Sequence, residues 1–150
     1  MEGDTAGQPG FPVTSGPFEG WRTYRDVDPF EDALGPFFFR KEADGRVLCA
    51  TVVEKKHLNG HGIMHGGAMM TFADYALFMV AIDHMGEFGG VTVQLDSTFV
   101  APGQLGETVY ADGEVVRASG SLIFVRGRIF RGEQTLLSWN GIIKKLKRKL

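Results

Sequence analysis

A chain of 150 residues, 43% of them hydrophobic and 23% charged, has the composition of one ordinary globular domain, not of a disordered or fibrous protein. Its 16 Lys and Arg against 18 Asp and Glu give a formal charge of −2, so no overall electrostatic attraction to nucleic acid is expected. The single cysteine, Cys49, excludes an intramolecular disulfide and is interpreted as a small core residue. The longest apolar stretch, Tyr75 to Ile82, is too short for a membrane span, and the first ten residues lack a signal-peptide pattern, so we expect a cytoplasmic protein.

The N-terminal part of the chain divides into an arm and a short helix. Residues 1–17 are rich in Gly and Pro and should lack regular structure apart from local turns. We therefore expect a flexible arm over residues 1–17 and a single domain over residues 18–150. Asp28 is a favourable helix cap and Pro29 suits the first helical position, while Gly35 and Pro36 should end this helix almost at once.

Strand signals occur on both sides of a central segment. The pair Asp44-Gly45 is a strong hairpin signal, and it separates two runs that we expect to be strands. After Gly89-Gly90 the chain consists of β-rich runs separated by turn residues, which predicts an antiparallel meander. The expected strands cover residues 37–40, 47–53, 91–100, 108–117, 122–130 and 135–146.

A long helix is expected between these two groups of strands. Residues 68–82 are apolar nearly all the way round a helix and contain no Gly or Pro, so other structure must surround them. Together with about six strands, this predicts an α+β fold in which a curved antiparallel sheet wraps around a central helix. In the strand that follows Gly90, Val91, Val93 and Leu95 alternate with polar residues, which predicts that their face is buried.

The segment from Asn59 to Gly67 is polar and Gly-rich, and it leads directly into the apolar helix. Gly66 and Gly67 allow a ligand to approach the backbone closely, and the first N–H groups of a helix are unpaired donors that could hold a developing oxyanion. A tight turn into a helix also needs such glycines, so the purely structural interpretation stays open.

Asp74 lies in the interior of the apolar helix. Its charge is costly to bury unless it is paired, and its neighbours at helical spacing offer no charged partner, so the carboxylate should face a cleft or an interface. The residue is either a general base or nucleophile, or a solvent-facing or hydrogen-bonded helix residue. The histidines at positions 57, 61 and 65 have no nearby carboxylate or cysteine, so we expect no metal.

The motif formed by Asn59, His65-Gly66-Gly67 and Thr71-Phe72-Ala73-Asp74 resembles the signature of the hotdog-fold acyl-CoA thioesterases related to PaaI, the thioesterase of the phenylacetate pathway. The resemblance extends from about residue 28 to residue 143. It implies a hotdog fold, a long central helix wrapped by a curved antiparallel sheet, with two subunits pairing their sheets edge to edge. It also implies a homo-oligomer, more often a tetramer formed as a dimer of dimers than a dimer, with the active site at the dimer interface.

The same resemblance implies hydrolysis of acyl-CoA to a carboxylic acid and CoA, with no cofactor beyond the CoA of the substrate. Asp74 would act as general base or nucleophile, and it would face Asn59 and the Gly66 region of the partner subunit. The Gly66 N–H and Asn59 would polarise the carbonyl oxygen, and His65 would help to hold the substrate. Thr92 corresponds to a Ser or Thr that helps to hold the water in several relatives.

The resemblance also implies a place for the CoA portion, with Arg117 meeting a phosphate. The CoA-binding residues that it implies are Arg117, Ala118, Ser119, Gly120, Ser121, Leu122 and Gly67. The basic C-terminal run that begins at Lys144 is either a solvated tail or attracts an anionic ligand. Two alternatives remain on the same fold: an acyl-CoA hydratase, and a non-catalytic acyl-CoA-binding protein that would have no need of Asp74.

Overall fold

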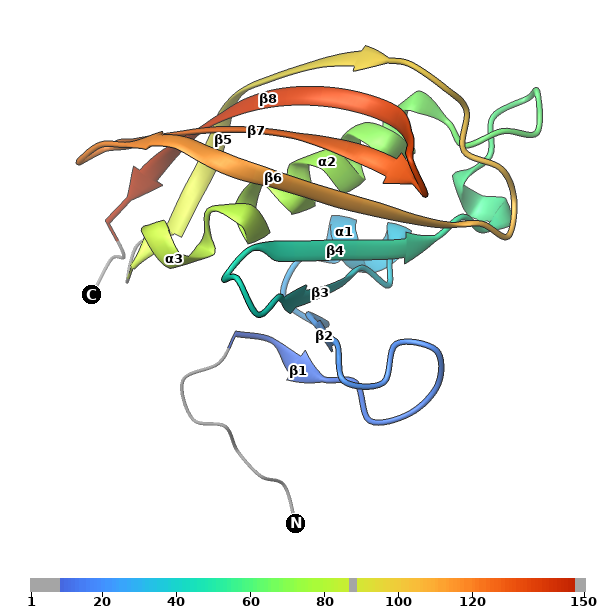
Figure 1. The fold of residues 1–150 in the computed structure, drawn as a ribbon, viewed down its shortest axis with the longest axis horizontal. Helices are drawn as coiled ribbons and strands as arrows, with labels where there is room; N and C mark the ends of the chain where they lie inside the picture. The colour runs from blue at the N-terminus through green and yellow to red at the C-terminus, as the bar shows by residue number, and fades with distance from the viewer. Residues whose placement is uncertain (1–8, 87–88, 148–150) are drawn as a thin grey trace.

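A curved antiparallel sheet lies against the long helix α2 (Gly66–Val80) in the computed structural model, which describes residues 9–86 and 89–147 (Figure 1). The predicted arrangement of one central helix and a curved antiparallel sheet is confirmed. The sheet has eight strands instead of about six, in the order β1-β2-β3-β4-β6-β7-β8-β5. The strands are β1 (Phe11–Pro12), β2 (Arg22–Thr23), β3 (Phe38–Lys41), β4 (Val47–Val52), β5 (Gly89–Phe99), β6 (Thr108–Ala118), β7 (Leu122–Arg131) and β8 (Gln134–Leu146).

The two additional strands come from the N-terminal part of the chain: β1 lies within residues 1–17, where only turns are predicted, and β2 lies in the following segment, for which no strand is predicted. Phe11 pairs with Thr23 and Pro12 with Arg22, and β2 in turn pairs with β3. The Arg22 guanidinium donates to the carbonyls of Pro9 at 2.6 Å and Gly10 at 2.7 Å, and so ties the two segments together. Sequence patterns did not reveal these strands because each has only two residues. Residues 1–8 of the predicted arm lie outside the described residues.

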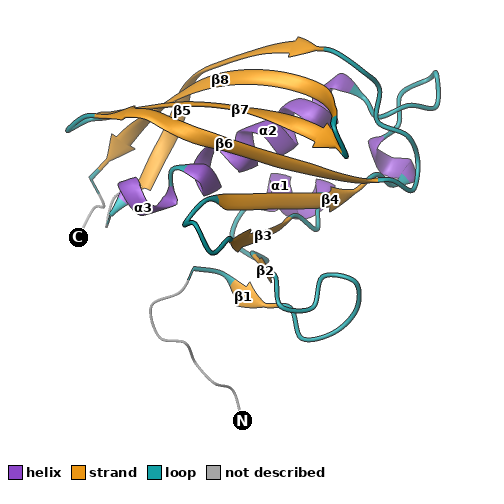
Figure 2. Ribbon diagram, in the orientation of Figure 1, coloured by secondary structure: helices purple, strands orange, loops and turns teal. Residues whose placement is uncertain are grey.

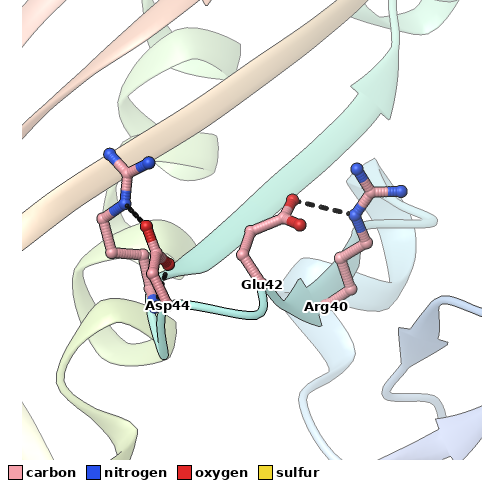
Figure 3. Close-up of polar contacts among 4 residues, drawn as sticks. Arg40, Glu42 and Asp44 are labelled. Carbon is pink, nitrogen blue, oxygen red and sulfur yellow. Dashed lines mark hydrogen bonds and ion pairs between the residues drawn. The ribbon is translucent and has the colours of Figure 1, made fainter.

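The hairpin predicted from Asp44-Gly45 connects β3 to β4. Gly45 has a φ of +86°, a backbone conformation that glycine adopts without strain. Figure 3 shows the ion pairs around this turn: Arg40 Nε donates to Glu42 at 3.0 Å, and Asp44 accepts from Arg46 Nε at 2.7 Å. These pairs are exposed and add little to stability, so the glycine turn and the paired strands define the hairpin.

The core lies between the sheet and the buried side chains of α2. Phe72, Ala73, Ala76 and Leu77 have no exposed surface, and they pack against inward-facing residues of the sheet such as Ile143. Figure 2 shows α2 as the long helix alongside the strands, followed by the short helix α3 (Ile82–Met85). Cys49 is completely buried, and burial raises the pKa of its thiol well above the usual range, in agreement with a core residue.

The short helix α1 (Pro29–Leu34) begins as predicted, with the Asp28 carboxylate accepting from the backbone N–H groups of Phe30 at 3.1 Å and Glu31 at 3.0 Å. Its C-terminal end is tied to the 3-10 turn η1 (Lys55–His57), because buried His57 places its Nε2 2.5 Å from the Leu34 carbonyl oxygen. The backbone carbonyl of His57 also accepts a hydrogen bond from the His65 N–H, at 2.7 Å. One histidine therefore connects α1 to the start of α2.

The predicted burial of one face of β5 is wrong in its first half. Val91 and Val93 are 44% and 53% exposed, whereas Thr92 is half-buried and faces α2. The register of β5 with β8 shifts between Thr92 and Gln94, which marks a β-bulge. A bulge inserts one residue and reverses the alternation, so both Thr92 and Leu95 lie on the helix side. Strand β5 is also the last strand of the sheet, which leaves one of its edges unpaired in the described chain.

Candidate active site

The centre of the candidate site is a hydrogen bond between α2 and β5. Thr92 Oγ1 donates to Asp74 Oδ1 at 2.5 Å, and both residues are half-buried. Met70 lies one turn earlier on the same face of α2, and its sulfur is 2.8 Å from Ser97 Oγ of β5. Because strand and helix run in opposite directions, successive turns of α2 meet β5 at these two places. The bulge is what brings Thr92 to the carboxylate.

Asp74 opens into a cleft of about 690 Å³. None of the described residues that line this cleft is a Lys, Arg or His, so the lining offers the carboxylate no cation to pair with. Burial is the main cause that raises the pKa of Asp74; the hydrogen bond from Thr92 lowers it, and the charge of Asp28 raises it. A half-buried carboxylate with an elevated pKa and an open cleft in front of it has the properties of a general base.

A second group of predicted residues lies at the N-terminal end of α2. His65 caps the helix through its Nδ1, which accepts the Gly67 N–H at 2.8 Å. The Gly66 N–H has no acceptor among the described residues and points out of the first turn of the helix. A Cβ atom on Gly66 would lie 3.1 Å from the ring of Phe99, so a side chain there would crowd that ring. The end of α2 thus offers one unpaired backbone donor.

Asn59 lies in the loop before α2. Its Oδ1 accepts the backbone N–H groups of His61 at 2.9 Å and Ile63 at 3.3 Å. Because the oxygen is engaged, the amide NH₂ is the group left to donate to a ligand. Asn59 and Gly66 therefore both present N–H donors near the start of α2.

These donors are not brought to Asp74 within one chain. Gly66 and Asp74 are eight residues apart on one helix, which at 1.5 Å per residue is about 12 Å. A base and an oxyanion donor that act on one carbonyl must both lie about 3 Å from the reacting group. The cleft of Asp74 also includes neither Gly66 nor Asn59 in its lining. One described chain therefore presents the two halves of such a site at separate places.

A third place holds the predicted CoA-binding residues. Arg117 and Ala118 end β6, Leu122 begins β7, and residues 119–121 form the turn between them. Ser119 stabilises this turn, because its backbone N–H and its hydroxyl both donate to the Leu122 carbonyl, at 2.8 Å and 3.0 Å. Lys145 N donates to the Ser121 carbonyl at 2.8 Å, so the basic end of β8 lies beside the turn. Lys144 and Lys145 belong to β8, while Arg148 and Lys149 lie outside the described residues.

Sequence reasoning did not identify three residues that line the cleft with Asp74, namely Tyr24, Glu31 and Tyr75. Glu31 has the position of an ordinary acidic residue in the first turn of a helix, and Tyr75 reads as part of an apolar helix. The packing of α1 beside α2 brings Glu31 and Tyr75 to the cleft, and the segment after β2 brings Tyr24. No group of three or more His, Cys, Asp or Glu in the described part of the chain is arranged to hold a metal ion. None of the described helices is long and apolar enough to cross a membrane.

Comparison with known proteins identifies the class to which this fold and these residues belong. Residues 61–138 match the model of the thioesterase superfamily, which covers the helix and most of the sheet, and the chain belongs to this family. Human acyl-coenzyme A thioesterase 13 is 32% identical over 95 residues, which are 63% of this chain and 68% of that protein.

Solved structures agree with this assignment. A mutant of the phenylacetic acid degradation protein PaaI from Thermus thermophilus is 28% identical, with a TM-score of 0.68 over 79% of this chain and 100% of the other. A Streptococcus mutans protein bound to acetyl CoA is 26% identical, with a TM-score of 0.70 over 83% and 98% of the two chains. The hotdog fold and the similarity to PaaI-related thioesterases that the motif predicted are confirmed.

Proposed function

We propose that the protein hydrolyses the thioester bond of acyl-CoA and releases a carboxylic acid and CoA. The observation that carries this proposal is Asp74, a half-buried carboxylate in an open cleft, hydrogen-bonded to Thr92 and without a cationic partner in the described lining. Membership of the thioesterase superfamily and the similarity to an acyl-coenzyme A thioesterase support the reaction type. The similarity to a protein bound to acetyl CoA supports the substrate class.

The chemistry requires a base and a site for negative charge. In the general-base form, Asp74 takes a proton from water while the water oxygen bonds to the thioester carbonyl carbon. The tetrahedral intermediate then collapses, the C–S bond breaks, and Asp74 returns the proton to the CoA sulfur. In the nucleophilic form the carboxylate bonds to the carbonyl carbon first, the C–S bond breaks and CoA leaves as a thiolate. Water then hydrolyses the resulting anhydride, which releases the carboxylic acid, restores the Asp74 carboxylate and supplies the proton that the CoA thiolate takes up. Thr92 holds the carboxylate in position in both forms. No metal or redox cofactor takes part in these steps.

The developing oxyanion is held by the N–H groups of Gly66 and Asn59, and His65 helps to hold the substrate. Because about 12 Å of helix separates Gly66 from Asp74 in one chain, we propose that these donors come from the partner subunit of a homodimer. The unpaired edge of β5 supports this arrangement, since it carries the exposed side chains of Val91, Val93 and Phe99. Pairing of two β5 edges about a two-fold axis would bring the start of one α2 toward Asp74 of the other.

The CoA portion binds at the β6–β7 turn in this proposal. Arg117 contacts a phosphate, residues 118–122 and Gly67 shape the binding surface, and Lys144 and Lys145 beside the turn add positive charge. We further propose that two dimers associate into a tetramer. We also propose that the protein acts in the cytoplasm, where a lone thiol such as Cys49 stays reduced.

The decisive experiment compares the wild-type protein with Asp74→Asn on a panel of aliphatic and aromatic acyl-CoAs, with a dye that traps the released thiol. Loss of a general base should lower turnover at least about a hundredfold. Asp44→Asn is the matched control, because Asp44 is an exposed carboxylate at the β3–β4 turn, outside the lining of the cleft and away from β5, and the variant should retain activity. Light scattering checks that each variant keeps the oligomeric state of the wild type.

Three outcomes would contradict the proposal or a part of it. If the wild type adds water to an unsaturated acyl-CoA without releasing thiol, the protein is a hydratase. If it binds acyl-CoA and leaves it unchanged, it is a binding protein. An Asp74→Asn variant that is folded and fully active would remove Asp74 from the mechanism.

A further inference from the structure

His57 is a buried polar residue that the proposed chemistry does not use. Among the described residues of polar type, only Thr51 and His57 are buried, and His57 is 2% exposed. It lines neither the cleft of Asp74 nor the cavity of about 370 Å³ beside α1, so a substrate in either place has no direct contact with its ring. Burial of an imidazole is unfavourable unless its nitrogens are hydrogen-bonded, and here both of them are.

The hydrogen-bond partners of the ring define its tautomer. Nδ1 accepts the backbone N–H of Glu54 at 2.9 Å, and Nε2 lies 2.5 Å from the carbonyl oxygen of Leu34. An N–H can only donate and a carbonyl oxygen can only accept, so Nε2 carries the proton and Nδ1 the lone pair. Glu54 precedes η1 and Leu34 ends α1, so the two nitrogens are committed to the backbone of two different elements. The ring is therefore engaged in holding these elements and not in proton transfer to a substrate.

The loop that carries Asn59, residues 58–64, begins and ends at one backbone contact. The carbonyl of His57 accepts the N–H of His65 at 2.7 Å, which closes the base of this Asn59 loop. Asn59 follows His57 by two residues, and Gly66 follows His65 directly. The two proposed donors to the oxyanion thus lie close to the same closed base, one on the loop and one at the start of α2.

The Asn59 loop is held laterally on two sides. On one side it pairs with residues 103–104, and Met64 donates its N–H to the Gly103 carbonyl at 2.9 Å. On the other side His57 Nε2 donates to the Leu34 carbonyl. A loop with a lateral contact on one side can rotate about that contact, whereas contacts on two sides fix its orientation. Loss of the imidazole would leave the donors free to turn away from the oxyanion.

The C-terminal end of α1 is a firm anchor for this contact. Thr51 Oγ1 donates to the Pro36 carbonyl at 3.0 Å, and Lys56 Nζ donates to the Gly35 carbonyl. Thr51 belongs to β4 and is 1% exposed, so this end of α1 is attached to the sheet independently of His57. The contribution of His57 is to attach the loop to an end that is already held.

We propose that His57 is a positioning residue, which keeps the donors of Asn59 and Gly66 in their reactive orientation by tying the base of the Asn59 loop to the end of α1. This proposal rests on the proposed thioesterase function and concerns the same site. A displacement of about 1 Å can lower a rate about a hundredfold, even when its origin lies away from the reacting atoms. The donors act on charge that develops in the transition state, so their displacement should lower kcat and leave ground-state binding nearly unchanged.

The first test compares His57→Ala with the wild type on an acyl-CoA that the wild type hydrolyses. We expect kcat to fall about a hundredfold. The Kd of a CoA thioether, in which CH₂ replaces the carbonyl group, should stay within about twofold of the wild-type value, because this ligand has no oxygen for the donors to hold. Thr51→Val is the matched control, since it also removes a buried hydrogen bond to the end of α1 but leaves the loop attached. It should retain most of the wild-type kcat.

Two shorter changes keep the test informative if His57→Ala does not fold. In His57→Gln the amide nitrogen is as many bonds from Cβ as Nε2 and can still donate to the Leu34 carbonyl. In His57→Asn the amide oxygen takes the place of Nδ1 and can still accept from Glu54, but the side chain is too short to reach Leu34. We expect His57→Gln to retain kcat within about tenfold of the wild type and His57→Asn to lose about a hundredfold.

A double-mutant cycle tests whether His57 acts through the donors. Asn59→Ala should cost at least about tenfold less in the His57→Asn background than in the wild type, because the donor that it removes is already displaced. Equal costs in the two backgrounds, an active His57→Asn, or a Thr51→Val that loses as much kcat as His57→Ala would each overturn the proposal while leaving thioester hydrolysis intact. Absence of thiol release by the wild type would instead refute the proposed function.

Discussion

At the scale of single residues, the contact between Thr92 and Asp74 opposes the effect of burial on the pKa of the carboxylate. The Thr92 hydroxyl donates to Asp74 at 2.5 Å and lowers its pKa, in opposition to burial. Thr92→Val removes this donor, so the pKa of Asp74 should rise and less carboxylate should be present at any given acidic pH. We expect the acid limb of the kcat/KM profile to move to higher pH, with a loss of about tenfold at the acid end and a smaller loss at alkaline pH.

Thr92→Ser is the control, because it keeps the hydroxyl and should keep the profile of the wild type. A profile for Thr92→Val that is lowered equally at every pH would mean that Thr92 acts by some means other than the ionisation of Asp74.

At the scale of elements, the close contact of β6, β7 and β8 depends on a glycine in the middle strand. A Cβ atom on Gly127 would lie 2.3 Å from the Asp112 carbonyl oxygen and 2.3 Å from the Trp139 ring. Trp139 is 1% exposed and cannot turn away into solvent. Gly127→Ala should therefore destabilise the protein by about 1–3 kcal/mol through overpacking, as measured by chemical unfolding.

Gly89→Ala provides the comparison, since a Cβ atom there meets nothing within 4 Å. Its free energy of unfolding should be within about 0.5 kcal/mol of the wild type or slightly higher. Equal stability of the two variants would mean that the sheet adjusts freely around Trp139.

Some elements of this fold can be predicted from the sequence, and others cannot. The apolar pattern of residues 68–82 predicts α2 because a helix with few polar positions must be enclosed, and Asp74 stands out against that pattern. Strand β5 was predicted, but the buried face of its first half was not, because the bulge between Thr92 and Gln94 reverses the alternation and nothing in the local sequence marks it. Glu31 and Tyr75 were missed because their meeting depends on the packing of α1 against α2, which no local pattern encodes.

At the scale of the whole molecule, the separation of Asp74 from the Gly66 and Asn59 donors predicts complementation between subunits. Asp74→Asn and Asn59→Ala homodimers should both be strongly impaired. When the two variants are unfolded and refolded together in equal amounts, half of the dimers contain one subunit of each kind, and one of their two sites has only native residues. Activity should then recover to about a quarter of the wild-type value. Activity that remains at the level of the separate variants after mixing would indicate that each chain builds its own site.

The N-terminal strands β1 and β2 have a consequence for how far such an assembly can grow. A sheet with two open edges can add subunits at both ends and form a fibre. Here the edge of β3 is already paired by β2, and the last strand on that side, β1, has only two residues, one of them Pro12, which cannot donate to a further strand. Of the two sheet edges formed by described residues, the β5 side is the one that offers a long row of backbone groups. In the proposed dimer, edge pairing would therefore end after a single event, and the continuous sheet would close as a pair of subunits instead of becoming a polymer.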